Sequence, residues 1–139
     1  MEPVMEKYIA VLGSSHVRRL KSFVNGPPNF EKLYTRTFSK DAVTEFFGVS
    51  GMKVDDAFNF IGDIAARRPD VIVVQVGSND QNRYPLAADL VHALTSLVYE
   101  LWRVSKVVVV MGLLRRYGHR CYNVWAADFN KLMATQELA

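Results

Sequence analysis

Cysteine is almost absent from the sequence: Cys121 is the only one in 139 residues. A disulfide within the chain is therefore excluded, and such sparse cysteine fits a reducing compartment. Long hydrophobic runs are missing too. The longest, at 107–114, contains a glycine and is far below the roughly 20 residues that a membrane-spanning helix needs. Residues 1–7 include acidic side chains and no apolar segment of the kind that a secretion signal requires. We therefore expect an intracellular protein, cytoplasmic or nuclear, with no membrane span.

A strong excess of one charge is missing as well. The 17 lysines and arginines against 14 aspartates and glutamates leave a formal net charge of +3, with an isoelectric point of about 9.1. This balance permits contact with nucleic acid without requiring it, because many soluble enzymes are equally basic. The sequence contains no internal repeat, linker or low-complexity segment. A chain of this size buries roughly 68–70% of its unfolded surface when it folds, so we expect one domain over residues 1–139.

Apolar stretches typical of strands alternate with segments of helical period along the chain. The sequence predicts strands at 7–12, 42–49, 71–76 and 106–111, and helices at 15–23, from 54 to the break at 69–70, at 86–103 and at 121–137. The third and fourth of these strands are almost entirely β-branched, as is typical of parallel strands that are covered on both faces. The alternation predicts an α/β domain, a three-layer α/β/α sandwich with a mostly parallel sheet.

Small or polar turns follow the predicted strands. They comprise residues 13–15, 48–51, 77–80 and 115–120. The carboxyl ends of parallel strands lie along one edge of the sheet, where ligands of open α/β sheets bind, so we expect a site there. Ser15 also begins a predicted helix, where unpaired N–H groups and the helix dipole favour negative charge. It is a candidate nucleophile or anion-binding hydroxyl, and an ordinary N-cap serine explains the same pattern about equally well.

Three of these turns resemble the sequence blocks of a known hydrolase family. Gly-Ser-Ser-His at 13–16, Gly-Val-Ser-Gly at 48–51 and Val-Gly-Ser-Asn-Asp at 76–80 resemble blocks I, II and III of the SGNH (GDSL-like) hydrolases, in the same order and at the family's spacing. The resemblance covers essentially the whole chain and implies the flavodoxin-like sandwich of that family. Segments at 11–20, 122–123 and 129–132 are further similar to the esterase-like domains of non-LTR retrotransposon first open reading frames.

The resemblance implies a serine esterase that hydrolyses a small acyl ester. Ser15 would attack the ester carbonyl to give an acyl-enzyme, and the backbone N–H groups of Ser15 and Gly51, with the side-chain amide of Asn79, would form the oxyanion hole. Glycine would suit position 51 because a backbone donor needs close approach, and an amide can donate at position 79 while its oxygen is anchored. Ordinary turn roles at Gly51 and Asn79 are the structural alternatives. We expect no metal and no cofactor.

The chain departs from the family pattern at two places. Ser14 occupies the position where the family usually has aspartate, and a hydroxyl ties down the turn more weakly. The carboxyl-terminal Asp-x-x-His block, which follows a fifth strand in the family, is absent, and without a general base a serine hydroxyl is a weak nucleophile. Among the histidines, His119 in the loop after the fourth strand is the candidate substitute base. His16 is poorly aimed at its neighbour, and His92 fits a packed helix position.

The missing block leaves an alternative function open, namely a catalytically inactive hydrolase-like domain that serves as a binding or assembly module. Nucleic acid is one partner to consider for it. Arg83, Arg115 and Arg116 lie in loops at the expected site edge, near His119 and Arg120. Such a rim suits an anion, whether phosphate, an acidic acyl group or a nucleic-acid backbone. Ordinary surface charge is at least as good an explanation.

The missing fifth strand would also leave the strand at 106–111 as a hydrophobic sheet edge, which proteins normally cover. Three covers are open: a second copy that pairs there to form a homodimer, the helix at 121–137 folded over it, or a longer, untruncated chain that continues beyond Ala139. A monomer in solution with this strand uncovered would count against all three.

Overall fold

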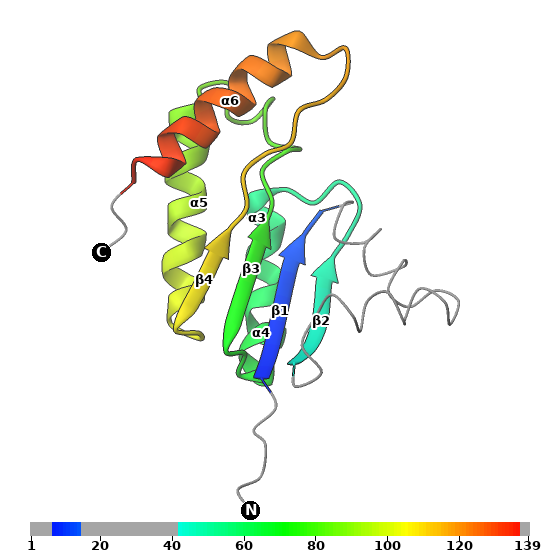
Figure 1. Cartoon of the computed structure of the whole chain (residues 1–139), viewed down its shortest axis with the longest axis vertical. Helices are drawn as coiled ribbons and strands as arrows, with labels where there is room; N and C mark the ends of the chain where they lie inside the picture. The colour runs from blue at the N-terminus through cyan, green and yellow to red at the C-terminus, as the bar shows by residue number, and fades with distance from the viewer. Residues whose placement is uncertain (1–6, 15–41, 137–139) are drawn as a thin grey trace, which may run out of the picture.

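The computed structural model describes residues 7–14 and 42–136, and the account below concerns these residues. Four strands form one parallel sheet in the order β2-β1-β3-β4 (Figure 1). Their bounds are β1 Lys7–Gly13, β2 Ala42–Gly48, β3 Val71–Gln75 and β4 Val107–Val110. The predicted strands are therefore confirmed, with ends close to the predicted ones.

The carboxyl ends of all four strands lie at one edge of the sheet. Lys7 of β1 pairs with Ala42 of β2, and Ile9 of β1 pairs with Val71 of β3. Val71 in turn pairs with Val107 of β4. Because every pairing is parallel, the carboxyl ends all lie at the end to which the arrows of Figure 1 point. This is the edge at which the sequence predicts a site.

Helices connect the strands. They are α3 Val54–Ala57, the 3-10 turn η1 Phe58–Phe60, α4 Ile61–Arg67, α5 Ala87–Trp102 and α6 Arg120–Ala134. The helix predicted from residue 54 is divided by η1. Phe58, Phe60 and Ile61 all pack against the core, and a 3-10 turn brings side chains two and three positions apart closer to one side than an α-helix does. None of the helices described is long and apolar enough to cross a membrane.

One face of the sheet is buried under these helices. The cross-strand neighbours Ala10 and Ile72, and likewise Leu12 and Val74, are 0% exposed. They belong to one core cluster with residues of α3, α4, α5 and α6, among them Val54, Ile64, Leu90 and Phe129. Figure 1 shows α5 beside the sheet and α6 crossing α5. The α/β architecture predicted from the sequence is confirmed, whereas the helix predicted at 15–23 lies outside the described residues.

β4 ends the sheet on one side, since no further strand within 7–14 or 42–136 pairs with it. Val107 and Val109 on this strand are 47% and 46% exposed. α6 lies against the strand from the other face, where Val110 shares a hollow of about 380 Å³ with Phe129 and Met133. The helix therefore approaches β4 without pairing with its edge. Pairing with a second copy and a longer chain stay predictions.

Candidate active site

Three turns meet at the carboxyl edge of the sheet. The backbone N–H of Ser14, just after β1, donates to the carbonyl of Gln75 at the end of β3 at 3.3 Å. The side-chain Nδ2 of Asn79, in the turn after β3, donates to the carbonyl of Met52, in the turn after β2, at 3.1 Å. The structure thus joins the third predicted block to Met52, the residue directly after the second block. Ser15, the predicted nucleophile, lies outside the described residues and directly follows buried Ser14.

Gly51 lies in a tight turn that closes when the Met52 N–H donates to the Val49 carbonyl at 3.3 Å. Its φ of +75° is in the left-handed region, which explains why a glycine stands there. A Cβ added at Gly51 would meet nothing within 4 Å. Backbone conformation is thus a sufficient reason for this glycine, and the expected close approach of a substrate to its N–H stays a prediction.

The Asn79 amide is fixed beside this turn. One Nδ2 proton goes to the carbonyl of Met52, the residue after Gly51, and the second amide proton is left for another acceptor. The Gly51 N–H donates to no residue that the structure describes. A backbone donor and a side-chain donor on neighbouring turns are the elements from which an oxyanion hole is built.

Asp80 is a buried carboxylate, for which the sequence alone predicts no role. It is 0% exposed, and the Val54 N–H donates to its Oδ2 at 3.1 Å and to its Oδ1 at 3.4 Å. Burial raises the pKa of Asp80, and the hydrogen bond from Val54 offsets part of that effect. Asn79 and Asp80 together hold the segment around Met52 through side-chain bonds. The only sequence signal for this role was the acidic residue directly after Asn79.

Arg116 joins the loop after β4 to the turn that carries Asn79. Its Nη2 donates to the Ser78 carbonyl at 2.9 Å, and its guanidinium carbon lies 4.1 Å from the centre of the Tyr122 ring. The side chain of Asn123 bonds both the N–H and the carbonyl of Arg116, at 2.7 and 2.8 Å. The Arg116 guanidinium, which is predicted to bind a ligand, therefore already contacts Ser78 and Tyr122. Asn123 was missed because nothing local marks it.

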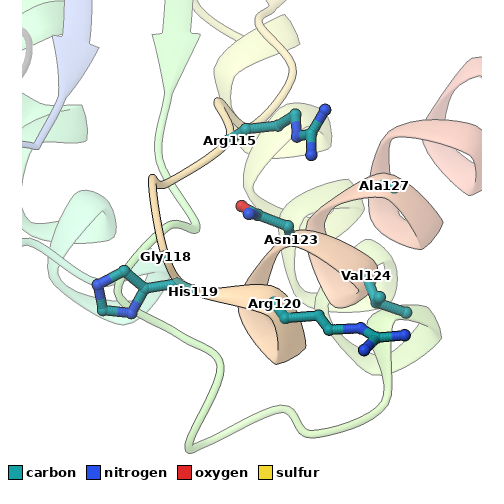
Figure 2. A pocket seen from close by; sticks show the side chains of 7 residues that line it. All are labelled: Arg115, Gly118, His119, Arg120, Asn123, Val124 and Ala127. Atoms are coloured by element: carbon teal, nitrogen blue, oxygen red, sulfur yellow. The ribbon is translucent and has the colours of Figure 1, made fainter.

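Arg83 and Arg115, the other arginines of the predicted rim, differ in their surroundings. Arg83 forms an ion pair with Asp55 at 2.8 Å, and its Nε donates to the Tyr84 hydroxyl at 3.2 Å. Arg115 has no ion pair with any residue in the described ranges. It lines a hollow together with His119 and Arg120 (Figure 2). Of the three predicted ligand-binding arginines, Arg115 has the freest guanidinium.

Two of the three histidines are described, and both are exposed. His119 is the N-cap of α6, in the loop that Arg116 ties to Ser78, and its ring points away from Arg115 and Arg120 in Figure 2. His92 lies on α5, whose packed positions do not include it. The prediction that His92 is packed is therefore wrong, because it falls just outside the buried stripe of the helix.

One Asp-x-x-His run was overlooked in the sequence, Asp89-Leu90-Val91-His92. It lies in the first turns of α5, where Leu90 and Val91 are buried and Asp89 and His92 are exposed. The two side chains therefore occupy the solvent face of a helix, and the run is not the carboxyl-terminal block that the family has after a fifth strand. Within the described residues, no three His, Cys, Asp or Glu side chains are grouped to hold a metal.

Comparisons with known proteins give a match in structure and none in sequence. No protein-family model and no curated protein matches the sequence. Solved structures do match. TesA gives a TM-score of 0.70 over 94% of this chain and 74% of its own, at 20% identity. AlinE4, an SGNH-hydrolase family esterase, gives 0.69 over 96% and 72%, also at 20% identity.

A third match comes from Veillonella parvula, a member of the lipolytic protein G-D-S-L family, with a TM-score of 0.69 over 92% of this chain and 70% of that chain, at 14% identity. The chain therefore has the α/β fold of the SGNH hydrolases, as the three sequence blocks predict. At these identities the likeness concerns the fold. The similarity to retrotransposon esterase-like domains stays a prediction.

Proposed function

We propose that this domain is an SGNH-type serine esterase for small acyl esters. Ser15 is the nucleophile, and the N–H groups of Ser15 and Gly51 with the Asn79 amide form the oxyanion hole. The observation that carries the proposal is the 3.1 Å bond from Asn79 Nδ2 to the Met52 carbonyl. It fixes the Asn79 amide to the residue after Gly51, at the edge of the sheet where β1 ends.

The chemistry follows from these positions. The Ser15 hydroxyl attacks the ester carbonyl carbon as a base takes its proton, and the carbonyl oxygen becomes an oxyanion. Donors fixed in advance at that oxygen are each worth about a hundredfold or more in rate. The alcohol leaves with the proton from the base, and water then hydrolyses the acyl-enzyme by the same steps.

His119 is the proposed base. It is exposed at the start of α6, and its loop is anchored to the carbonyl before Asn79 through Arg116. A His119→Gln variant keeps the size and polarity of the side chain and cannot take a proton near neutral pH. We expect it to lose most of the activity, with the same loss at each substrate concentration.

A catalytically inactive binding module is the second candidate function. The observation in its favour is that the Asp-x-x-His run at 89–92 lies on the solvent face of α5. Without a base, Ser15 remains a weak nucleophile and the pocket edge serves only to bind. The two candidates differ in one measurable property, turnover of an ester.

The test is hydrolysis of a short-chain chromogenic ester by the wild type, Ser15→Ala and the control Ser96→Ala. Ser96 is an exposed serine of α5 whose hydroxyl bonds only the His92 carbonyl among the described residues. We expect the wild type and Ser96→Ala to turn over alike and Ser15→Ala to be inactive. If the folded wild type is as inert as Ser15→Ala, the esterase proposal is wrong and the binding module takes its place.

A further inference from the structure

A hollow of about 480 Å³ lies at the start of α6 (Figure 2). Its lining includes Arg115, His119, Arg120, Asn123, Val124 and Ala127. We propose that this hollow binds a phosphate-bearing ligand. The inference goes beyond ester hydrolysis. Of the proposed catalytic residues that are described, His119 lines the hollow, whereas Gly51 and Asn79 do not.

The ionisable residues that line the hollow are all basic. They are Arg115, His119 and Arg120, and no acidic residue lines the hollow. The first turn of α6 has no acidic residue either. Guanidinium groups with no carboxylate in the lining of the hollow favour an anionic ligand.

Neither arginine of the hollow has an ion-pair partner among the residues that the structure describes. The ion pairs within the described ranges involve Arg67, Arg83 and Arg103, and neither Arg115 nor Arg120 takes part in one. In Figure 2 the side chains of Arg115 and Arg120 extend from two ends of the hollow, with Asn123 between them. A guanidinium presents a planar fork of N–H donors that matches the oxygens of a phosphate.

The backbone that carries these arginines is fixed in advance. The Asn123 side chain bonds both backbone groups of Arg116, at 2.7 and 2.8 Å. The His119 N–H donates to the Arg116 carbonyl at 3.2 Å, and the Asn123 N–H donates to the His119 carbonyl at 2.9 Å. A ligand that binds here therefore does not have to order the loop, and binding to a fixed loop loses less entropy.

The size and floor of the hollow narrow the class of ligand. About 480 Å³ lies within the usual range of small-molecule sites, roughly 300–1,000 Å³, and exceeds the space that one phosphate fills. Val124, which is 58% exposed, and Ala127 add an apolar surface beside the charges. A polyphosphate, or a phosphate attached to a larger group, fits this combination. A small polyphosphate and the backbone of single-stranded nucleic acid share that chemistry.

The experiment measures binding of tripolyphosphate by calorimetry and of a labelled single-stranded oligonucleotide by anisotropy, with the full chain. Arg115→Ala, Arg120→Ala and the double variant are compared with Arg103→Ala. Arg103 is a matched control, because it is exposed and lines another hollow, of about 390 Å³, that also contains Asp70. We expect affinity to fall about tenfold for each arginine removed from the α6 hollow and to stay unchanged in Arg103→Ala.

The same binding measurements distinguish a small phosphate-bearing ligand from a nucleic acid. Binding of tripolyphosphate alone assigns the hollow to a small ligand. Binding of the oligonucleotide, competed by tripolyphosphate and weakened by salt, assigns it to a nucleic-acid backbone. Ser15→Ala is expected to bind like the wild type in either case, so failure of the esterase proposal leaves this result intact.

The proposal is overturned if the folded wild type binds neither probe, or if Arg103→Ala weakens binding as much as the hollow variants do. Thermal unfolding of each variant shows whether it is folded. Arg115 and Arg120 make no side-chain hydrogen bond or ion pair with another described residue, so their removal is expected to leave the fold unchanged. Should the double variant unfold, the single variants carry the test.

Discussion

The turn after β3 and the loop after β4 leave the same edge of the sheet and are held in opposite ways. In the turn, the side chains are bound: the Asn79 amide donates to the Met52 carbonyl, and the Asp80 carboxylate accepts from the Val54 N–H. Both of these side chains are at least partly buried. The turn is therefore built to hold its functional groups in one position.

In the loop after β4, the backbone is bound instead. The Asn130 side chain bonds the N–H and carbonyl of Leu113 at 2.7 and 2.9 Å, as Asn123 does for Arg116. Most of the loop's side chains remain exposed, Arg115 among them. A fixed side chain suits chemistry that needs a donor at one point, and a fixed backbone with free side chains suits binding of a charged ligand.

Removal of the Asn79 amide is expected to have the largest effect. Asn79→Ala deletes the proposed donor to the oxyanion, so kcat of ester hydrolysis should fall about a hundredfold or more with little change in KM. Steady-state kinetics measure both constants. Asn82→Ala, at an exposed asparagine of the following turn, is the control and should retain full activity. An equal loss in the control, or a change confined to KM, contradicts the proposed role.

Gly77 tests how tightly the turn after β3 is fixed. Its φ is +119°, and an added Cβ would lie 3.3 Å from Leu90 Cδ2 and 3.5 Å from Leu113 Cδ2. Gly77→Ala should therefore lower the free energy of unfolding by about 1–3 kcal/mol in urea titrations. Gly62→Ala, in α4 with nothing near its Cβ, should raise it by about 0.5–1 kcal/mol. A Gly77→Ala protein as stable as the wild type would refute this account.

The two asparagines of α6 should differ in what their loss does. Each makes two hydrogen bonds to the loop backbone, but Leu113 is buried and Arg116 is exposed, so water can replace only the bonds of Asn123 readily. We expect Asn130→Ala to lower the free energy of unfolding by about 2 kcal/mol and Asn123→Ala by about 1 kcal/mol or less. The reverse order, measured by the same titrations, would show that exposure does not govern these bonds.

Asp80 should give the smallest effect, visible in its pH dependence. Burial raises its pKa above the ordinary value of 3.8, so the folded protein holds this proton more tightly than the unfolded chain. The stability that this site contributes is present below about pH 4 and is lost as the pH rises through the folded pKa. Relative to Asp80→Asn, the wild type should therefore lose stability as the pH rises above about 4. A constant difference between the two proteins would contradict the raised pKa.

The strands could be predicted from the sequence because their signal is local. β3 and β4 are runs of β-branched residues between turn residues, and the structure places both where the pattern does. The break at η1 could not be predicted in the same way, since it depends on Phe58 and Phe60 packing against the core. The burial of His92 was predicted wrongly for a related reason. The helical period of a sequence defines the edge of the buried face only to within about one residue.

The candidate site was predictable in its positions and less so in its contacts. Gly51 and Asn79 were found from their turns, and their adjacency follows from the parallel sheet. The structure also shows contacts of Asp80, Asn123 and Arg116 with residues that are not their neighbours in sequence. No local sequence pattern predicts such pairs. The contact of Arg116 with Ser78, for example, joins residues 38 positions apart.

β1 comes first among the described strands and yet lies in the middle of the sheet. It pairs on one side with β2, from Ala42 onward, and on the other with β3, from Val71 onward. Both pairings close long loops before they gain any hydrogen bond, and parallel strands offer no hairpin from which to begin. Folding should therefore be slow for a chain of this size, with the β3-α5-β4 segment able to form before β1 joins it. We therefore expect the edge that carries the candidate active site to be complete only after β1 has joined the sheet.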